Sequence, residues 1–283
     1  MPVDHLSLPL FTALVWAGAF AAGLLGALTG LGGGVVIVPM LVLLFNVDIK
    51  YAIGASLVSV IATSSGAAAA YVKEGYSNIR IGMLLEIATT IGALAGAFLS
   101  LVVEPWVIAI IFGVVLLVSA YLSSRPRVQN LATDKPDPLA VRLKLDGTMP
   151  TPEGLRHYHV HRVPAGFALM FVAGVLSGLL GIGSGALKVL ALDQAMRLPF
   201  KVSTTTSNFM IGVTAAASAG VYLARGYIDP GLAMPVLLGV LPGSLLGALI
   251  LTHAPVKTLR IVFAVAIAAL AVEMIYKGVT GKM

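Results

Sequence analysis

The sequence contains no cysteine and few charged residues, and each shortage excludes classes of protein. None of its 283 residues is cysteine, which excludes disulfide frameworks, thiolate metal sites and thiol catalysis. Only 11% of the residues are charged, whereas 58% are hydrophobic. A soluble domain has roughly a quarter of its residues charged, because much of its surface faces water. A chain this poor in charge is not an ordinary soluble domain.

Long apolar runs follow one another with little polar sequence between them. A helix of about 20 apolar residues can cross the hydrocarbon core of a bilayer. The sequence therefore predicts an all-α integral membrane protein with about ten transmembrane helices. The net charge of +6 is typical of the basic cytoplasmic loops of such proteins, so we expect no nucleic-acid partner. The apolar runs lie at about residues 10–28, 35–45, 53–72, 81–103, 106–122, 165–180, 186–196, 202–223, 232–251 and 258–276.

The longest polar stretch divides the chain into two halves. Residues 124–164 are rich in Arg, Lys, His, Asp and Pro, and have little capacity to form a core of their own. We expect a first transmembrane repeat at residues 1–123, an exposed cytoplasmic linker at 124–164 and a second repeat at 165–283. No catalytic residue, metal ligand or cofactor is predicted, since the alternating His157, His159 and His161 lie on this linker without a convergent acid or base.

The two halves are copies of one unit. An offset of 151 residues aligns residues 23–97 with the second half, and 20 of these 75 positions are identical without a gap. The aligned residues include Gly32 with Gly183 and Tyr76 with Tyr227. Chance matches between apolar segments do not reproduce a shared order of glycines and tyrosines, so the chain arose by internal duplication.

The distribution of basic residues favours one orientation. Five crossings per half give the two repeats opposite topology. With the linker in the cytoplasm, 13 of the 18 Lys and Arg residues lie on the cytoplasmic side, as the positive-inside rule requires. We therefore predict inverted repeats with both termini outside. If the short runs at 35–45 and 186–196 are re-entrant, each half has four crossings and the repeats are parallel.

A glycine cluster precedes the short second run of each half. Residues 30–34 read GLGGG and residues 181–185 read GIGSG. Short, glycine-interrupted segments at matching positions of two repeats point to the central binding site of a transporter. Each restarted helix would present unpaired N–H groups, which suit an anion. The alternative is that these glycines only allow close helix packing. The predicted substrate-binding residues here are Gly32, Gly33, Gly34, Gly183, Ser184 and Gly185.

Lys188 follows the second cluster within an apolar run. A charge at this depth costs at least about 2.5–3.5 kcal/mol, so it is a functional candidate that could contact an anion. The alternatives are an ion pair with Asp193 or snorkelling to the interface. Ile37 is the equivalent residue in the first half, so the site would be asymmetric. Glu86 and Glu273 also lie in apolar runs, and the sequence gives them no role beyond possible protonation.

Hydroxyl and amide side chains are abundant in the third and eighth runs. Such groups can hold an oxyanion through directional hydrogen bonds. The alternative is hydrogen bonding between helices, a common use of Ser and Thr in membranes. The predicted substrate-binding residues in these runs are Ser56, Thr204, Ser207 and Asn208.

These motifs together resemble one family. The segments at residues 26–39, 54–75, 178–188 and 201–208 are similar to the TauE/SafE sulfite exporter family, also called the toluene-sulfonate-uptake permease family. The resemblance implies a multi-pass permease of a bacterial or archaeal plasma or inner membrane. It also implies a substrate such as sulfite, a sulfonate or a related organosulfur anion.

The sequence thus leads to a secondary transporter for a small sulfur-containing anion. The anion would bind between the two glycine-rich breaks near the bilayer midplane. An anion channel and a permease for a non-sulfur organic anion are the alternatives. The anion and the lipid bilayer are the expected partners. The sequence leaves open the direction of transport, the coupling ion and whether the chain forms a homo-oligomer.

Overall fold

The helices of the protein coincide with the predicted apolar runs. The computed structural model describes residues 7–29, 33–73, 76–124, 137–151, 154–251 and 256–281. Each predicted run matches one helix, except that the run at 186–196 forms a short α-helix continued by a π-helical turn. The first half contains α1 (Leu8–Thr29), α2 (Gly34–Leu44), α3 (Ile49–Lys73), α4 (Ile79–Val102) and α5 (Pro105–Ser124). The second half contains α7 (Val163–Leu180), α8 (Gly185–Leu190), η1 (Ala191–Ala195), α9 (Phe200–Ala224), α10 (Pro230–Leu251) and α11 (Val256–Thr280).

Several helices have the length and composition of membrane spans. Five segments meet both criteria among the described residues, at Pro9–Gly26, Ile79–Val102, Val163–Leu180, Phe200–Ala224 and Pro230–Gly247. The outward face of α4 is apolar along its length, because Met83, Ile87, Ile91 and Phe98 are all exposed. Water would penalise such a surface, whereas lipid chains solvate it. The protein is therefore a multi-pass membrane protein.

The halves pack by exchanging helices. In the first half Gly23 of α1 faces α10, where an added methyl group would lie 2.4 Å from the carbonyl oxygen of Val240. In the second half the equivalent Gly174 of α7 faces α4, and the same methyl would lie 2.2 Å from the carbonyl oxygen of Thr89. Thr89 and Val240 are at equivalent positions of the two repeats, so the first helix of each repeat packs against the fourth helix of the other. The exchange recurs at Gly92 against Phe171 and at Gly243 against Phe20.

Equivalent helices also pack against each other in antiparallel fashion. Near the beginning of α3, Gly54 contacts Tyr227, which follows α9, and further along α3 Ser64 contacts Gly212 in the middle of α9. The fifth helices of the two halves behave alike, since Gly113 of α5 contacts Ala271 of α11 while Gly278 contacts Trp106. In each pair, residues nearer the start of one helix contact residues nearer the end of the other, so the two helices run in opposite directions.

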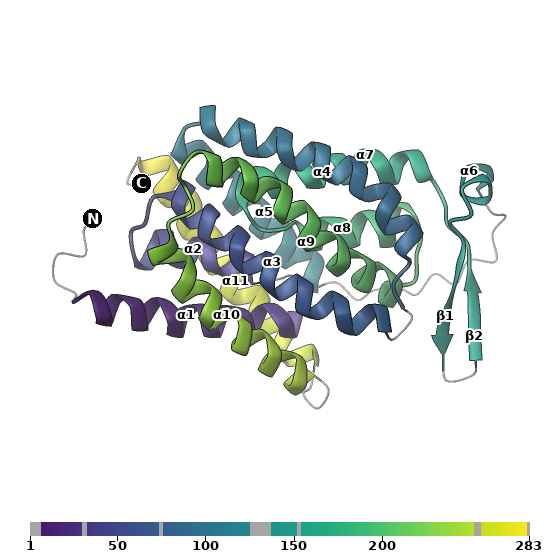
Figure 1. Ribbon diagram of the computed structural model, residues 1–283, viewed down its shortest axis with the longest axis horizontal. Coiled ribbons are helices and arrows are strands. Elements are labelled where there is room, and N and C mark those ends of the chain that lie inside the picture. Colours follow the sequence, from purple (N-terminus) through teal and green to yellow (C-terminus); the bar gives the residue numbers. More distant parts are fainter. Residues whose placement is uncertain are drawn as a thin grey trace.

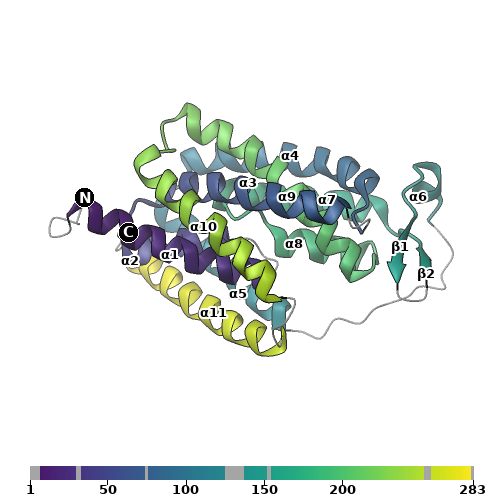
Figure 2. The same ribbon diagram turned by 60° about the horizontal axis from the view of Figure 1, so that its bottom comes forward.

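The helical bundle has two distinct ends. Figure 1 shows a small β-hairpin at one end, whereas the beginning of α1 and the end of α11 lie at the other, and the turned view in Figure 2 agrees. At the end away from the hairpin, Lys277 Nζ donates to the carbonyl oxygen of Leu43 at 3.4 Å and Lys50 Nζ to that of Leu101, also at 3.4 Å. The ends of α2, α4 and α11 and the beginning of α3 therefore meet there.

Part of the linker is folded and docked on the bundle. It contains α6 (Pro138–Arg142), β1 (Gly147–Thr151) and β2 (Gly154–Tyr158), and the two strands pair antiparallel with Gly147 opposite Tyr158. Leu145, Tyr158 and Val160 are buried in a core shared with residues of α4, α7 and α9. Burial raises the pKa of the Tyr158 phenol. The sequence suggested an exposed linker because its own apolar residues are few, but the bundle supplies the other side of this core.

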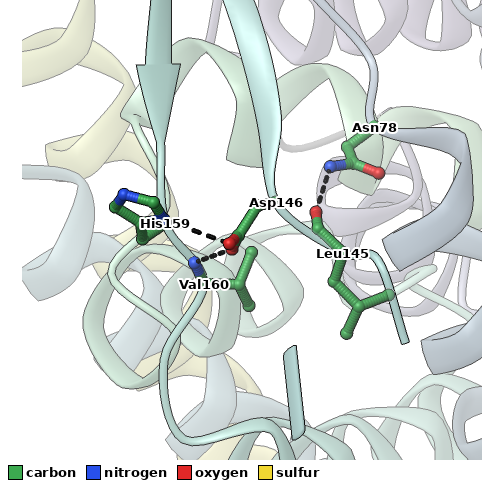
Figure 3. A network of polar contacts seen from close by, with 5 residues as sticks. All are labelled: Asn78, Leu145, Asp146, His159 and Val160. Carbon is green, nitrogen blue, oxygen red and sulfur yellow. Dashed lines mark hydrogen bonds and ion pairs between the residues drawn. The ribbon is translucent and has the colours of Figure 1, made fainter. Parts of the chain in front are cut away.

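Asn78 joins the linker to the bundle. Its Nδ2 donates to the Leu145 carbonyl oxygen and to the Tyr158 hydroxyl, both at 2.9 Å, while its Oδ1 accepts from Ile81 N at 3.1 Å and caps α4. Beside it, His159 Nδ1 lies 3.0 Å from Asp146 Oδ2, and Val160 N donates to Asp146 Oδ1 at 2.8 Å (Figure 3). This polar network fixes the hairpin at the beginning of α4.

Candidate functional site

The chain turns sharply between α7 and α8. Gly181 and Gly183 both have φ of 68°, in the left-handed region that glycine adopts without steric cost. Ser184 has φ of 49°, which is strained for a residue with a side chain. The Ser184 hydroxyl is buried and has no hydrogen-bond partner among the described residues. A buried hydroxyl in a strained residue marks this turn as a place where a ligand could bind.

The turns of the two halves touch each other. Gly34, the first residue of α2, lies so close to the end of α7 that an added methyl group would be 3.1 Å from the Gly181 carbonyl oxygen. That oxygen also accepts a hydrogen bond of 2.8 Å from Ser56 Oγ of α3. Gly33 is buried next to Val240 of α10, and Gly32 lies outside the described residues.

The predicted polar residues of α9 and α3 have different surroundings. The Ser56 hydroxyl donates to Gly181 and the Ser207 hydroxyl donates to the Gly185 carbonyl oxygen at 3.3 Å. Both therefore make the contacts between helices that the alternative interpretation described. Thr204 and Asn208 are half-buried, and the Thr204 hydroxyl has no partner among the described residues. Thr204 and Ser184 are thus the predicted residues whose hydroxyls remain available as donors.

Lys188 is fully buried and belongs to a three-residue polar network. Its side chain is 0% exposed, and its Nζ donates to Thr214 Oγ1 at 2.5 Å. Thr214 is likewise 0% exposed, and its hydroxyl donates to Glu86 Oε1 at 2.7 Å, sharing the bond with the Met210 carbonyl oxygen at 2.9 Å. Glu86 is 9% exposed, so the carboxyl group at the other end of the network is nearly buried as well. The network joins α8, α9 and α4 through the side chains of Lys188, Thr214 and Glu86.

The two oxygens of Glu86 differ in their environment. Oε1 accepts from Thr214 and also from Thr90 Oγ1 at 3.1 Å. Oε2 is buried and has no partner among the described residues. Removing one member of a buried pair of charges costs about 3–5 kcal/mol, because the other is left uncompensated. A buried carboxylate oxygen without a partner adds to this cost, so its presence here points to a function.

Glu86 was missed as a site residue because sequence position gives no sign of its neighbours. It lies in the first half, more than 100 residues from Lys188, and the two meet only because α4 packs against helices of the second half. One signal was available in the sequence. Both Glu86 and Lys188 occupy positions whose equivalents are apolar, Leu237 and Ile37, so both break the repeat.

A multi-pass bundle with two helix turns in contact, and with a buried lysine linked to a buried glutamate through a threonine, is typical of a membrane transporter. The family described as "Sulfite exporter TauE/SafE" matches residues 15–274. The chain belongs to this family, and the resemblance inferred from its motifs is confirmed.

Curated relatives extend over most of the chain. The "Probable membrane transporter protein YunE" of Bacillus subtilis is 29% identical over 277 residues, which cover 95% of this chain and 98% of the relative. The "Probable membrane transporter protein YdhB" of the same organism is 27% identical, covering 81% and 86%. A "Probable membrane transporter protein" of Xylella fastidiosa is 26% identical and covers 91% of each chain. No solved structure gives a significant match.

Proposed function

We propose that the protein is a secondary transporter for a small sulfur-containing anion, such as sulfite or a sulfonate, and that the anion binds at the α7–α8 turn beside Lys188. The single observation that carries this proposal is the fully buried lysine next to a strained turn. Its family membership points to sulfite as the first substrate to test.

The residues around the turn suit an oxyanion. Lys188 N donates to Ser184 O at 2.9 Å, so the lysine is one helical turn from Ser184. The Ser184 hydroxyl is a buried donor without a partner among the described residues, and so is that of Thr204 near the start of α9. An ammonium group and neutral hydroxyls in a low-dielectric interior would bind an anion through charge-assisted hydrogen bonds.

We further propose that the two repeats have opposite orientations in the membrane, with the linker in the cytoplasm. The antiparallel pairing of α3 with α9 and of α5 with α11 supports this proposal, because a two-fold axis in the membrane plane relates equivalent helices in that way. The position of the described ends, away from the hairpin, supports it as well (Figure 1).

Flux into proteoliposomes tests the substrate class. Purified protein should take up sulfite and at least one of taurine, sulfoacetate and thiosulfate, and internal substrate should accelerate uptake of external substrate. A channel would conduct without this acceleration, and a panel in which only non-sulfur organic anions move would refute the choice of sulfur anions.

A single substitution tests the proposed position of the site. Lys188→Met keeps the length of the side chain and removes its charge, so sulfite binding should weaken by about 10- to 100-fold, since a hydrogen bond to a charged group contributes about 1.5–3 kcal/mol. Lys144→Met, at an exposed lysine of the linker, is the matched control and should leave binding unchanged. Equal binding by the two variants would refute a role for Lys188 in holding the anion.

A further inference from the structure

We propose that Glu86 is a proton-binding site that couples anion transport to the proton gradient, with Thr214 linking its charge to that of Lys188. This inference rests on the proposed function, because it requires an anion to arrive beside Lys188. It adds the identity of the coupling ion and the residue that carries it.

The geometry gives the three residues separate roles. The Thr214 hydroxyl accepts from Lys188 Nζ and donates to Glu86 Oε1, so it transmits a change at either charge to the other. Glu86 Oε2 is buried and without a partner among the described residues, so it is the carboxylate oxygen open to a proton. Lys188 is the one residue that both the anion and Glu86 can use as a counter-charge.

Charge balance in a dry interior then requires proton uptake. Without an anion, the positive Lys188 and the negative Glu86 cancel. When a monovalent anion arrives beside Lys188, the same interior holds one positive and two negative charges, and low dielectric makes the excess charge unfavourable. A proton from the water on the entry side, bound at Glu86 Oε2, restores neutrality. Release of the anion on the far side returns Lys188 to Glu86, and the proton leaves to that side, so one proton crosses with each anion.

The other charged and titratable groups described on the neighbouring elements have different surroundings. Lys188 is linked to Glu86 by hydrogen bonds through Thr214. The helix α7, which packs on α4, has no titratable residue in its sequence. On α9, Lys201 is exposed near Tyr76, and the Tyr222 hydroxyl donates to Ser100 Oγ at 2.7 Å. Arg80 lies exposed near the start of α4, donating to the Lys144 carbonyl oxygen at 3.3 Å, and Asp193 in η1 is half-buried.

The duplication supplies an independent argument that the two charges act together. Thr63 is equivalent to Thr214, so both halves keep the threonine. Only one half-site has charges on either side of it, because Ile37 and Leu237 stand where Lys188 and Glu86 stand in the other. Glu86 and Lys188 both differ in type from their equivalents, and both belong to the network around Thr214. A shared function explains why the two changes occur at one place, whereas two separate packing roles would not.

The coupling is tested by counting protons per anion. Vesicles containing the protein and a pH-sensitive dye are given radiolabelled sulfite at equal pH on both sides, and proton and sulfite fluxes are recorded together. Sulfite itself takes up protons near neutral pH, but this contribution is the same for every variant. Glu86→Gln should therefore carry one proton fewer per sulfite than the parent protein, and an acidic exterior should no longer drive accumulation.

The control and the contrary results follow from the structure. Glu273→Gln makes the same chemical change at an exposed glutamate of α11 and should keep the parent ratio. Thr214→Val should disturb the coupling, whereas Thr63→Val should not, since the Thr63 hydroxyl bonds only within its own helix as far as the described contacts show. Sulfite flux in Glu86→Gln with the parent ratio would overturn the inference, and so would an equal loss in Glu273→Gln.

Two further outcomes separate this inference from the proposed function. If the parent protein moves no sulfur anion, the proposed substrate class fails. If Glu86→Gln moves none, Glu86→Asp keeps the carboxyl group and should recover both flux and the parent ratio. Recovery of flux in Glu86→Asp with a ratio lowered by one proton would show that a carboxyl group at this position does not suffice to bind the proton, and would overturn the inference.

Discussion

The pair formed by Lys188 and Glu86 predicts a specific pattern of stabilities. Lys188→Met deletes an ammonium group that is 0% exposed, and it leaves the buried Glu86 without its counter-charge, so that Glu86 must either stay negative in a dry interior or take up a proton. Breaking a buried pair in this way costs about 3–5 kcal/mol. Replacing both partners by neutral groups of similar size is nearly neutral by comparison. We therefore expect Lys188→Met combined with Glu86→Gln to be more stable than Lys188→Met alone.

The magnitude follows from the network. Glu86→Gln keeps an oxygen that can accept from Thr214 and Thr90 but removes the charge, so the double variant should recover about 2–4 kcal/mol of the loss. For a chain of this size, each kcal/mol shifts the melting temperature by roughly 2–4 °C. Thermal unfolding of the parent protein, Lys188→Met, Glu86→Gln and the double variant in one detergent measures this recovery. A double variant no more stable than Lys188→Met would show that Glu86 is not the lysine's counter-charge.

Three further predictions concern the frame around the site. Single cysteines at Arg142 and Thr280, in a chain without native cysteine, should be labelled from opposite sides of the membrane by an impermeant maleimide, and labelling from one side would refute inverted repeats. Gly174→Leu and the equivalent Gly23→Leu should each lower stability by several kcal/mol, because even a methyl group would lie 2.2 or 2.4 Å from a backbone oxygen. Gly220→Leu is the control, since Gly220 is exposed and an added methyl group there would meet no atom within 4 Å, and a melting temperature like that of this control would contradict the prediction. Asn78→Asp keeps the oxygen that caps α4 but loses the amide donor to Leu145 and Tyr158. The hairpin should then be held less firmly, and trypsin should cut after Arg156 faster than in the parent protein. An unchanged rate of cleavage would show that Asn78 does not hold the hairpin.

The sequence allowed the helices and the duplication to be predicted because both are local or periodic properties. Runs of apolar residues determine where helices lie in a membrane protein, and the glycines that recur at the 151-residue offset also contact equivalent partners in space. Lys188 was identified because a lone charge in an apolar run is costly. These inferences needed no knowledge of which helices are neighbours.

The remaining features depend on contacts between distant segments. Glu86 contacts Thr214 because α4 of one half packs against α9 of the other. The hairpin at residues 147–158 was read as exposed linker because its sequence is polar, yet its buried residues complete a core that the helices provide. The Ser56 hydroxyl donates to the Gly181 carbonyl oxygen, a contact between residues 125 positions apart that the sequence did not predict. No periodicity in the sequence encodes these pairings.

Residues that are identical in the two halves contribute to the helical frame, whereas the charges of the site occur in one half only. Lys50 lies 5.9 Å from the ring centre of Tyr227 at one end of the bundle, and the equivalent Lys201 lies 4.5 Å from that of Tyr76 at the other, so the frame is built twice. The charges of the site are present once.

Ile37, which is 0% exposed, stands where a second lysine would be, and Thr63 already stands where it would be bridged. Ile37→Lys alone should be destabilising by several kcal/mol, since a buried ammonium would lack a counter-charge. Adding Leu237→Glu supplies the missing acid at the position equivalent to Glu86 and should restore part of that loss. Thermal unfolding of the two single variants and the double variant in one detergent measures the coupling. A double variant less stable than Ile37→Lys would mean that the two halves are not equivalent around Thr63 and Thr214, and that the Lys188 network depends on local packing that the duplication does not preserve.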